Sequence, residues 1–88
     1  MGYITLRRKV EEKYNFRTRI EGISLNEKMK RIAVAGNNCL SLWNIRNEGG
    51  LELIAECAAD SVKNLAFSPD GDFLAACGDR FLTLYRIE

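Results

Sequence analysis

Short apolar stretches separated by turn residues run through most of the chain, and they predict β-strands. Three such stretches between residues 65 and 87 are divided by Ser68-Pro-Asp-Gly71 and by Gly78-Asp79. Proline presets the backbone at the start of a turn and glycine accepts a positive φ near its end, so Gly71 is expected to close a hairpin. Gly78 is expected to do the same. The pattern predicts an inner strand at 62–68, a second at 73–78 and a third at 81–87.

The same pattern occurs once more, earlier in the chain. Without a gap, residues 20–26, 32–37 and 40–45 align with 62–68, 74–79 and 82–87. We therefore expect strands at 20–26, 31–36 and 39–45, and an outer fourth strand at 51–57, where Glu52 and Glu56 alternate with apolar residues. Trp43 and Tyr85 take equivalent positions, and both are expected to pack between neighbouring sheets. A period of about 40–45 residues built from four short strands is typical of propeller blades.

The segment before residue 20 fits the same scheme. Ile4–Arg7 is similar to the third strand and Lys9–Asn15 to the fourth. We predict that residues 1–18 form the outer two strands of a preceding blade, 19–58 a complete blade, and 59–88 a blade that lacks its outer strand. The predicted fold class is all-β, with antiparallel four-stranded blades in an incomplete ring. Such a piece would expose an apolar blade face at each end.

Length and composition place the chain among small globular domains. It has 88 residues, of which 47% are hydrophobic and 28% charged, which is ordinary for a folded protein. The longest uncharged run, 32–45, is too short and too polar to span a bilayer. Residues 1–18 are charged and lack the apolar core of a secretory signal. We expect no membrane segment and a cytoplasmic location, with the nucleus as an alternative.

Candidate catalytic and metal-binding groups are few. The three cysteines, Cys39, Cys57 and Cys77, show no C-x-x-C spacing, and the chain has no histidine to complete a zinc site or activate a serine. Asp70 and Asp72 form the nearest carboxylate pair, but they flank a turn glycine. No glycine-rich phosphate loop is present. The sequence predicts reduced core cysteines, no metal, no cofactor and no enzymatic activity.

Charge is divided unevenly along the chain. Residues 1–31 hold nine Lys/Arg and four Glu, a net +5, whereas residues 32–88 hold four Lys/Arg and eight Asp/Glu, a net −4. Basic residues interleaved with Tyr3, Tyr14 and Phe16 are typical of nucleic-acid surfaces. Because Glu11 and Glu12 stand among them, a solvated outer strand is the favoured interpretation, and nucleic-acid binding is the less favoured one. The same split could order copies head to tail or steer an acidic partner.

These residues resemble a WD40-repeat protein over nearly the whole chain. The resemblance rests on Phe67-Ser-Pro-Asp-Gly71, on Leu74-Ala, on Asp79 placed six before Tyr85, and on the equivalent pair in the earlier unit, Asn37 and Trp43. It implies structural roles for Trp43, Tyr85, Asp79, Asn37 and Gly71. The family's Gly-His dipeptide is absent, so apolar packing is expected in place of a buried Asp-His-Ser/Thr-Trp hydrogen-bond network.

The resemblance also implies a function, namely a protein–protein interaction scaffold that binds a partner through blade loops. The loops that would form this surface supply six candidate partner-binding residues: Arg17, Arg19, Asn38, Asp60, Ser61 and Arg80. Within the family, the register from Ile4 to Ile45 is loosely similar to a propeller of a protein that acts in actin filament disassembly, which suggests a role in actin regulation. The alternative is a structural subunit that completes a ring by self-assembly or by docking on a larger protein. The remaining blades would then come from the same or another chain.

Overall fold

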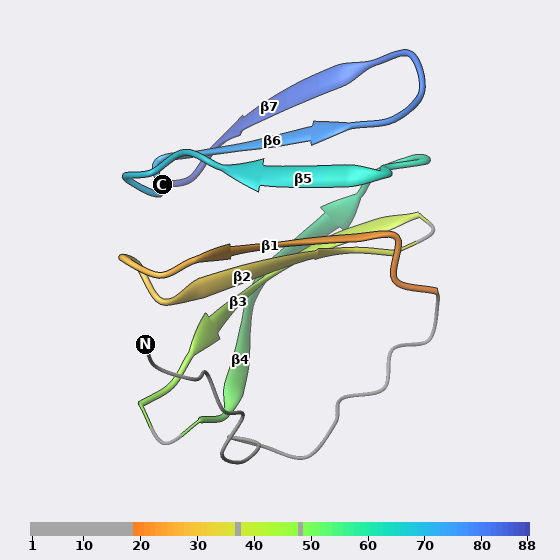
Figure 1. The fold of residues 1–88 in the computed structure, drawn as a ribbon. Coiled ribbons are helices and arrows are strands. Elements are labelled where there is room, and N and C mark those ends of the chain that lie inside the picture. Colours follow the sequence, from red (N-terminus) through yellow and green to blue (C-terminus); the bar gives the residue numbers. More distant parts are fainter. Residues whose placement is uncertain (1–18, 37, 48) are drawn as a thin grey trace, which may run out of the picture.

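The computed structural model describes residues 19–36, 38–47 and 49–88, which form two antiparallel sheets (Figure 1). The first sheet has the order β1-β2-β3-β4 and the second the order β5-β6-β7. The strands are β1 (Gly22–Asn26), β2 (Arg31–Ala35), β3 (Cys39–Ile45), β4 (Leu51–Ala58), β5 (Asn64–Phe67), β6 (Phe73–Cys77) and β7 (Leu82–Arg86). The predicted strands of residues 1–18, and the structural role predicted for Asn37, lie outside the described residues.

The predicted all-β fold is confirmed. All seven strands predicted between residues 20 and 87 form, and their ends agree with the prediction within two residues. Each strand within a sheet pairs with the next through a short connection, which is the outcome expected when turn residues separate apolar runs. One irregularity interrupts the β3–β4 ladder, between Leu42 and Trp43. The blade boundaries at 18/19 and 58/59 stay a prediction.

The core lies where the inner face of one sheet meets the inner face of the other. Small side chains from β2 let the two sheets approach closely, while leucines from β3, β5 and β6 fill the space between them. The buried members are Ala33, Ala35, Leu40, Val62, Leu65, Leu74 and Ala76. Tyr85 packs against this cluster, as predicted for an aromatic residue between neighbouring sheets.

Polar contacts fix how β1 and β5 lie beside each other (Figure 1). The Asn26 side-chain amide donates to the Ser68 carbonyl at 3.0 Å, and the Phe67 amide donates to the Ser24 hydroxyl at 3.1 Å. Asn26 is only 5% exposed, and its Oδ1 accepts the Met29 amide at 2.7 Å. Both ends of this buried side chain are therefore satisfied, one within its own sheet and one in the next.

Trp43 lies on the other face of the first sheet, because β3 alternates and its leucines point into the core. The indole Nε1 donates to the Ser41 hydroxyl at 2.9 Å, and this hydroxyl donates to the Val34 carbonyl at 3.3 Å. The expectation that apolar packing replaces a tryptophan hydrogen-bond network is thus wrong in part. A Trp–Ser link is present without histidine, and it ends on a backbone carbonyl.

The outward faces of both sheets are apolar, as predicted for blades at the ends of an incomplete ring. Ile23 and Leu25 on β1 are 57% and 61% exposed, and Leu82 and Leu84 on β7 are 73% and 63% exposed. These side chains point away from the shared core. In the described part of the chain, no helix is long and apolar enough to cross a membrane.

Candidate functional site

The predicted partner-binding loops lie at one edge of both sheets, at the right in Figure 1. We call this the loop edge and define it as residues 19–21, 38–39, 59–63 and 78–81. The opposite edge, called the turn edge, consists of residues 27–30, 46–47, 49–50 and 68–72. Because consecutive antiparallel strands reverse direction, alternate connections must lie at opposite edges, and sequence alone could place them so.

Backbone contacts hold the loops of the loop edge against one another. The Ala59 amide donates to the Asn38 carbonyl at 3.2 Å, which joins the β2–β3 connection to the β4–β5 connection. A Cβ on Gly78 would stand 2.6 Å from the Ser61 carbonyl oxygen and would overlap the Phe81 ring. Gly78 does not have a positive φ, so the expectation that it works like Gly71 is wrong. It is needed because neighbouring groups approach its Cα closely.

The structure brings five of the six predicted partner-binding residues to the loop edge, and all five are exposed. They are Arg19, Asn38, Asp60, Ser61 and Arg80. Ser61 has a φ of 53°, which is uncommon for a residue other than glycine and fixes the course of the β4–β5 loop. Asp79 is exposed beside Arg80. The sixth residue, Arg17, lies outside the described residues, and the binding role of the set stays a prediction.

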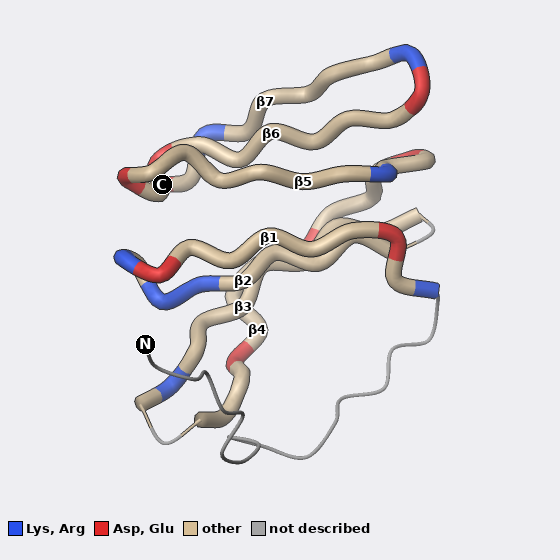
Figure 2. The backbone as a smooth tube through the Cα atoms, in the orientation of Figure 1, with Lys and Arg blue, Asp and Glu red and all other residues tan. Residues whose placement is uncertain are grey.

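Charges of both signs alternate along the loop edge (Figure 2). Its described charged residues are Arg19, Glu21, Asp60, Lys63, Asp79 and Arg80, three of each sign. Lys63 Nζ lies 3.9 Å from Glu21 Oε1, an ion pair that bridges the two sheets. A mixed pattern of this kind produces no extended positive field, so the described loop edge suits a protein surface better than a phosphate backbone.

Sequence reasoning missed one residue of the loop edge, Phe81. Its side chain is 40% exposed, and it lines a hollow of about 240 Å³ together with Ala59, Asp60, Val62, Thr83 and Tyr85. Aromatic residues, Phe among them, are enriched in the buried centres of protein interfaces. The available signal was an aromatic residue placed directly after a turn.

The titratable groups of the described residues favour structural roles. Burial, and then the charge of Glu56, raises the pKa of the Cys39 thiol, which opposes formation of a reactive thiolate. Hydrogen bonds from the Asp72 amide and the Ser68 hydroxyl lower the pKa of Asp70, so this carboxylate serves the turn. Within residues 19–36, 38–47 and 49–88, no group of three or more Cys, Asp or Glu is arranged to hold a metal.

Comparison with protein families gives one match: residues 52–86 match the family described as "WD domain, G-beta repeat", or WD40. The matched segment begins in β4 of the first sheet and runs through β5, β6 and β7. It covers the motifs around Gly71 and Tyr85 that carried the resemblance. The search of curated proteins found no match.

Several solved structures are similar to the chain, and two of them serve as examples. One is the crystal structure of RRP9 WD40 repeats, with a TM-score of 0.61 and 24% identity, over 67% of this chain and 19% of the other. The second is the crystal structure of the mitotic checkpoint complex, with a TM-score of 0.66 and 24% identity, over 80% of this chain and 24% of the other. The chain thus spans about a quarter or less of these proteins. The likeness over Ile4–Ile45 to the second propeller of actin-interacting protein 1 is not confirmed.

Proposed function

We propose that this chain, which carries a WD40 repeat and has the fold of WD40 propeller blades, is a protein–protein interaction scaffold that binds its partner through the loop edge. The two sheets form the rigid support, and the loops between their strands present the side chains. Binding residues are commonly placed on loops that a rigid scaffold positions. No reaction step is part of this function.

One observation carries the proposal: residues from four separate segments gather at one edge of two packed sheets. Arg19 precedes β1, Asn38 follows β2, Asp60 follows β4 and Arg80 follows β6. Contacts between the Asn38 and Ala59 backbones and between Glu21 and Lys63 hold these segments together. Charged side chains around an apolar residue give a polar rim and an apolar centre, which is the ordinary composition of a binding surface.

A cytoplasmic location and a partner from the actin cytoskeleton are finer parts of this proposal. The first rests on the three cysteines, which are free in the structure. The second rests on the loose similarity of Ile4–Ile45, and co-sedimentation with actin filaments tests it directly. A pellet that contains no more of the chain than a filament-free control would remove actin from the proposal.

The second candidate function, a structural subunit of a larger ring, is favoured by the apolar outward faces. Ile23 and Leu25 on one side and Leu82 and Leu84 on the other present the surfaces that further blades would cover. The solution mass of the 88-residue chain, measured by light scattering over a range of concentrations, distinguishes the cases. A stable complex of three or four copies would support a self-assembled ring, and a monomer would oppose it.

The binding surface is tested by reversing charge at the loop edge. We expect the triple variant Arg17→Glu, Arg19→Glu, Arg80→Glu to lose about tenfold in affinity for a protein partner, because rim charges steer association and reject mismatched partners. The unchanged chain and the variant are each immobilised and exposed to the same protein mixture. Quantitative mass spectrometry then compares the proteins that each of them retains. Affinities of the retained proteins are then measured in solution.

The matched control reverses charge at the turn edge, with Lys28→Glu and Arg46→Glu, which are exposed like Arg19 and Arg80. Arg46 also forms an ion pair of 3.5 Å with Glu52, and an exposed pair of this kind contributes little to stability. The control is expected to retain the same proteins as the unchanged chain. Circular dichroism melting confirms that both variants fold. Equal retention by the loop-edge variant and the unchanged chain would show that the loop edge is not the binding surface.

A further inference from the structure

We propose that Met29 is a site of reversible oxidation, and that its sulfoxide weakens the contact between the two sheets at the turn edge. The oxidant is a peroxide, and the product is methionine sulfoxide. Met29 lies at the edge opposite to the predicted binding loops. The inference therefore goes beyond the proposed function and does not depend on it.

Met29 lies in the β1–β2 turn, and its side chain reaches across to the turn of the second sheet. A Cβ placed on Gly71 would overlap Met29 Cγ, and its next neighbours would be Asn26 Oδ1 at 3.4 Å and Asn26 Nδ2 at 3.5 Å. All three atoms belong to the first sheet and its turn. Gly71 itself is buried. Met29 and Asn26 of the first sheet therefore cover the β5–β6 turn of the second.

The repeat shows that this contact joins equivalent positions. In the gap-free alignment of the two units, Met29 falls on Gly71. One turn has a long apolar side chain where the other has none, and this side chain lies over the glycine. Beside it, the Asn26 amide donates to the Ser68 carbonyl at 3.0 Å. Met29 and Asn26 thus form one continuous contact between the two turns.

The Met29 side chain is also open to solvent. The residue is 41% exposed, and the other residues of the turn, 27, 28 and 30, are exposed as well. A thioether needs no deprotonation before it reacts, so its exposure decides how fast a peroxide oxidises it. The one other methionine of the sequence, Met1, lies outside the described residues. Met29 therefore combines access for an oxidant with contact to the neighbouring sheet.

The reaction transfers one oxygen atom. The sulfur lone pair attacks one oxygen of hydrogen peroxide, the O–O bond breaks, and the proton of the transferred oxygen passes to the departing hydroxide to give water. Sulfur is oxidised and the peroxide is reduced. In the reverse step, methionine sulfoxide reductases return the thioether, while a dithiol is oxidised to a disulfide and the oxygen leaves as water.

A sulfoxide at this place finds no free donor in the turn that it covers. Its oxygen only accepts hydrogen bonds, and the nearby amides already have acceptors. The Gly71 amide donates to the Ser68 carbonyl at 2.9 Å, and the Asp72 amide donates to the Asp70 carboxylate at 3.0 Å. Because methionine is flexible and an unpaired polar group is costly to bury, we expect the oxidised side chain to turn toward water and leave Gly71 uncovered.

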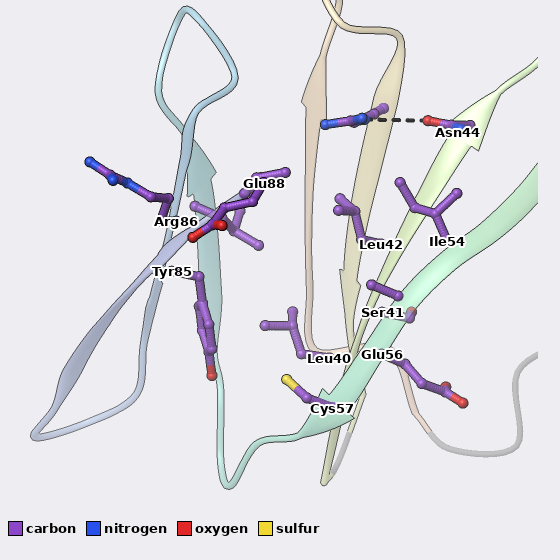
Figure 3. A pocket seen from close by; sticks show the side chains of 14 residues that line it. Leu40, Ser41, Leu42, Asn44, Ile54, Glu56, Cys57, Tyr85, Arg86 and Glu88 are labelled. Carbon is purple, nitrogen blue, oxygen red and sulfur yellow. Dashed lines mark hydrogen bonds between the residues drawn. The ribbon is translucent and has the colours of Figure 1, made fainter.

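The cysteines are the other groups that a peroxide oxidises, and the fold separates them from Met29. Cys39 belongs to the loop edge, and Cys57 and Cys77 lie within two residues of it. Cys57 lines a hollow of about 440 Å³ together with Leu40 and Tyr85, and Met29 does not line this hollow (Figure 3). Oxidation of cysteine and oxidation of Met29 therefore act at opposite edges.

The 88-residue chain is treated with hydrogen peroxide and then with dithiothreitol, which returns cysteine sulfenic acids and disulfides to thiols. Peptide mass spectrometry should show that Met29 is oxidised at a rate within about threefold of that of N-acetyl-methionine amide. The melting temperature of the oxidised chain should be lower by about 5 °C. Methionine sulfoxide reductases for both sulfoxide epimers should restore the original melting temperature.

The matched control is Met29→Leu, which keeps an apolar side chain of similar volume and retains Met1 and the three cysteines. Peroxide treatment should leave its melting temperature unchanged. A second variant, Met29→Gln, places a polar group of similar length over Gly71. This variant should lower the melting temperature as oxidation does, without any oxidant.

Hydrogen exchange locates the effect. The Gly71 amide lies in the turn that Met29 covers, whereas the Gly49 amide donates to the Arg46 carbonyl at 2.9 Å in the β3–β4 turn of the same edge. Oxidation should speed exchange of the Gly71 amide by about threefold or more and leave the Gly49 amide unchanged. Equal changes at both amides would contradict a local effect of Met29.

Three further outcomes would overturn the proposal. The first is that Met29 stays unoxidised in the folded chain while the reference compound is consumed. The second is that the oxidised and unoxidised chains have the same melting temperature. The third is an equal shift in treated Met29→Leu, which would assign the effect to Met1 or to the cysteines.

Discussion

The β1–β2 turn and the β5–β6 turn take equivalent places in the two repeat units, yet different chemistry builds them. In the β5–β6 turn the Ser68 hydroxyl donates to Asp70 at 2.7 Å and accepts the Phe73 amide at 3.0 Å, and Gly71 has a φ of 81°. The β1–β2 turn has neither proline nor glycine. There the Asn26 side chain accepts the Met29 amide, and Lys30 takes a φ of 54°.

The difference shows which turn holds the two sheets together. In the β5–β6 turn, the side chains of Ser68 and Asp70 make their hydrogen bonds within the turn. In the β1–β2 turn, Asn26 also donates to the Ser68 carbonyl of the next sheet, and Met29 lies directly over Gly71. The family match covers the self-contained turn and omits the other. Two equivalent turns of a repeat can therefore have the same shape, although one is stabilised by bonds within the turn and the other by contacts with the neighbouring sheet.

The largest expected effect comes from Asn26→Ala compared with Ser68→Ala, its equivalent. Asn26→Ala empties a buried position, removes the acceptor of the Met29 amide and leaves the Ser68 carbonyl with the Gly71 amide as its remaining donor, so the free energy of unfolding should fall by about 2–3 kcal/mol. Ser68→Ala removes bonds at a more exposed site and should cost about 1 kcal/mol. Urea denaturation measures both. Equal losses would mean that Asn26 serves only its own turn.

The fold could be predicted because two periodicities agree: alternation within each strand, and the repeat of the whole strand pattern along the chain. Strand ends followed from the residues that bound them, such as Gly71. The inter-sheet bond of Asn26 could not be predicted, since its acceptor belongs to the other repeat unit and asparagine by itself indicates only a turn. Gly78 was predicted for its backbone freedom, but the close approach of Ser61 and Phe81, which only the folded chain shows, explains it.

For the candidate site, position could be predicted but binding could not. Strand reversal assigns each loop to one edge, so Asn38, Asp60 and Arg80 were expected together. The exposure of Phe81 depends on how β7 packs beside the β4–β5 loop, and local sequence does not determine that. The identity of a partner depends on the partner's chemistry, which this chain does not contain.

A smaller effect is expected when the side chain is changed at the positive-φ residue of each turn. Gly71→Ala puts a Cβ at a φ of 81° and against Met29 Cγ, so the free energy of unfolding should fall by about 1–2 kcal/mol. In Lys30→Gly, the folded chain no longer holds a side chain at a positive φ, but the unfolded chain gains conformational freedom. These two effects oppose each other, so the free energy of unfolding should change by no more than about 0.5 kcal/mol. Melting temperatures should fall by about 5–10 °C for Gly71→Ala and hardly change for Lys30→Gly. Similar shifts for both variants would show that the turns tolerate side chains equally.

The smallest expected effect is a pH dependence that belongs to the β5–β6 turn. The Asp72 amide and the Ser68 hydroxyl donate to the Asp70 carboxylate and lower its pKa below the ordinary value. Because the folded-state pKa is lower than the unfolded one, this carboxylate stabilises the fold above about pH 4, and the contribution is lost as pH falls through the folded pKa. Denaturation of the unchanged chain and of Asp70→Asn between about pH 7 and pH 3 should show a difference in stability that disappears at the acid end. Asp72→Asn is the matched control, since it removes a charge from the same turn but leaves both hydrogen bonds in place. If this difference in stability persisted at the acid end, the hydrogen bonds of the β5–β6 turn would not depend on the charge of Asp70. The β5–β6 turn would then resemble the β1–β2 turn, in which the neutral side chain of Asn26 accepts the hydrogen bond.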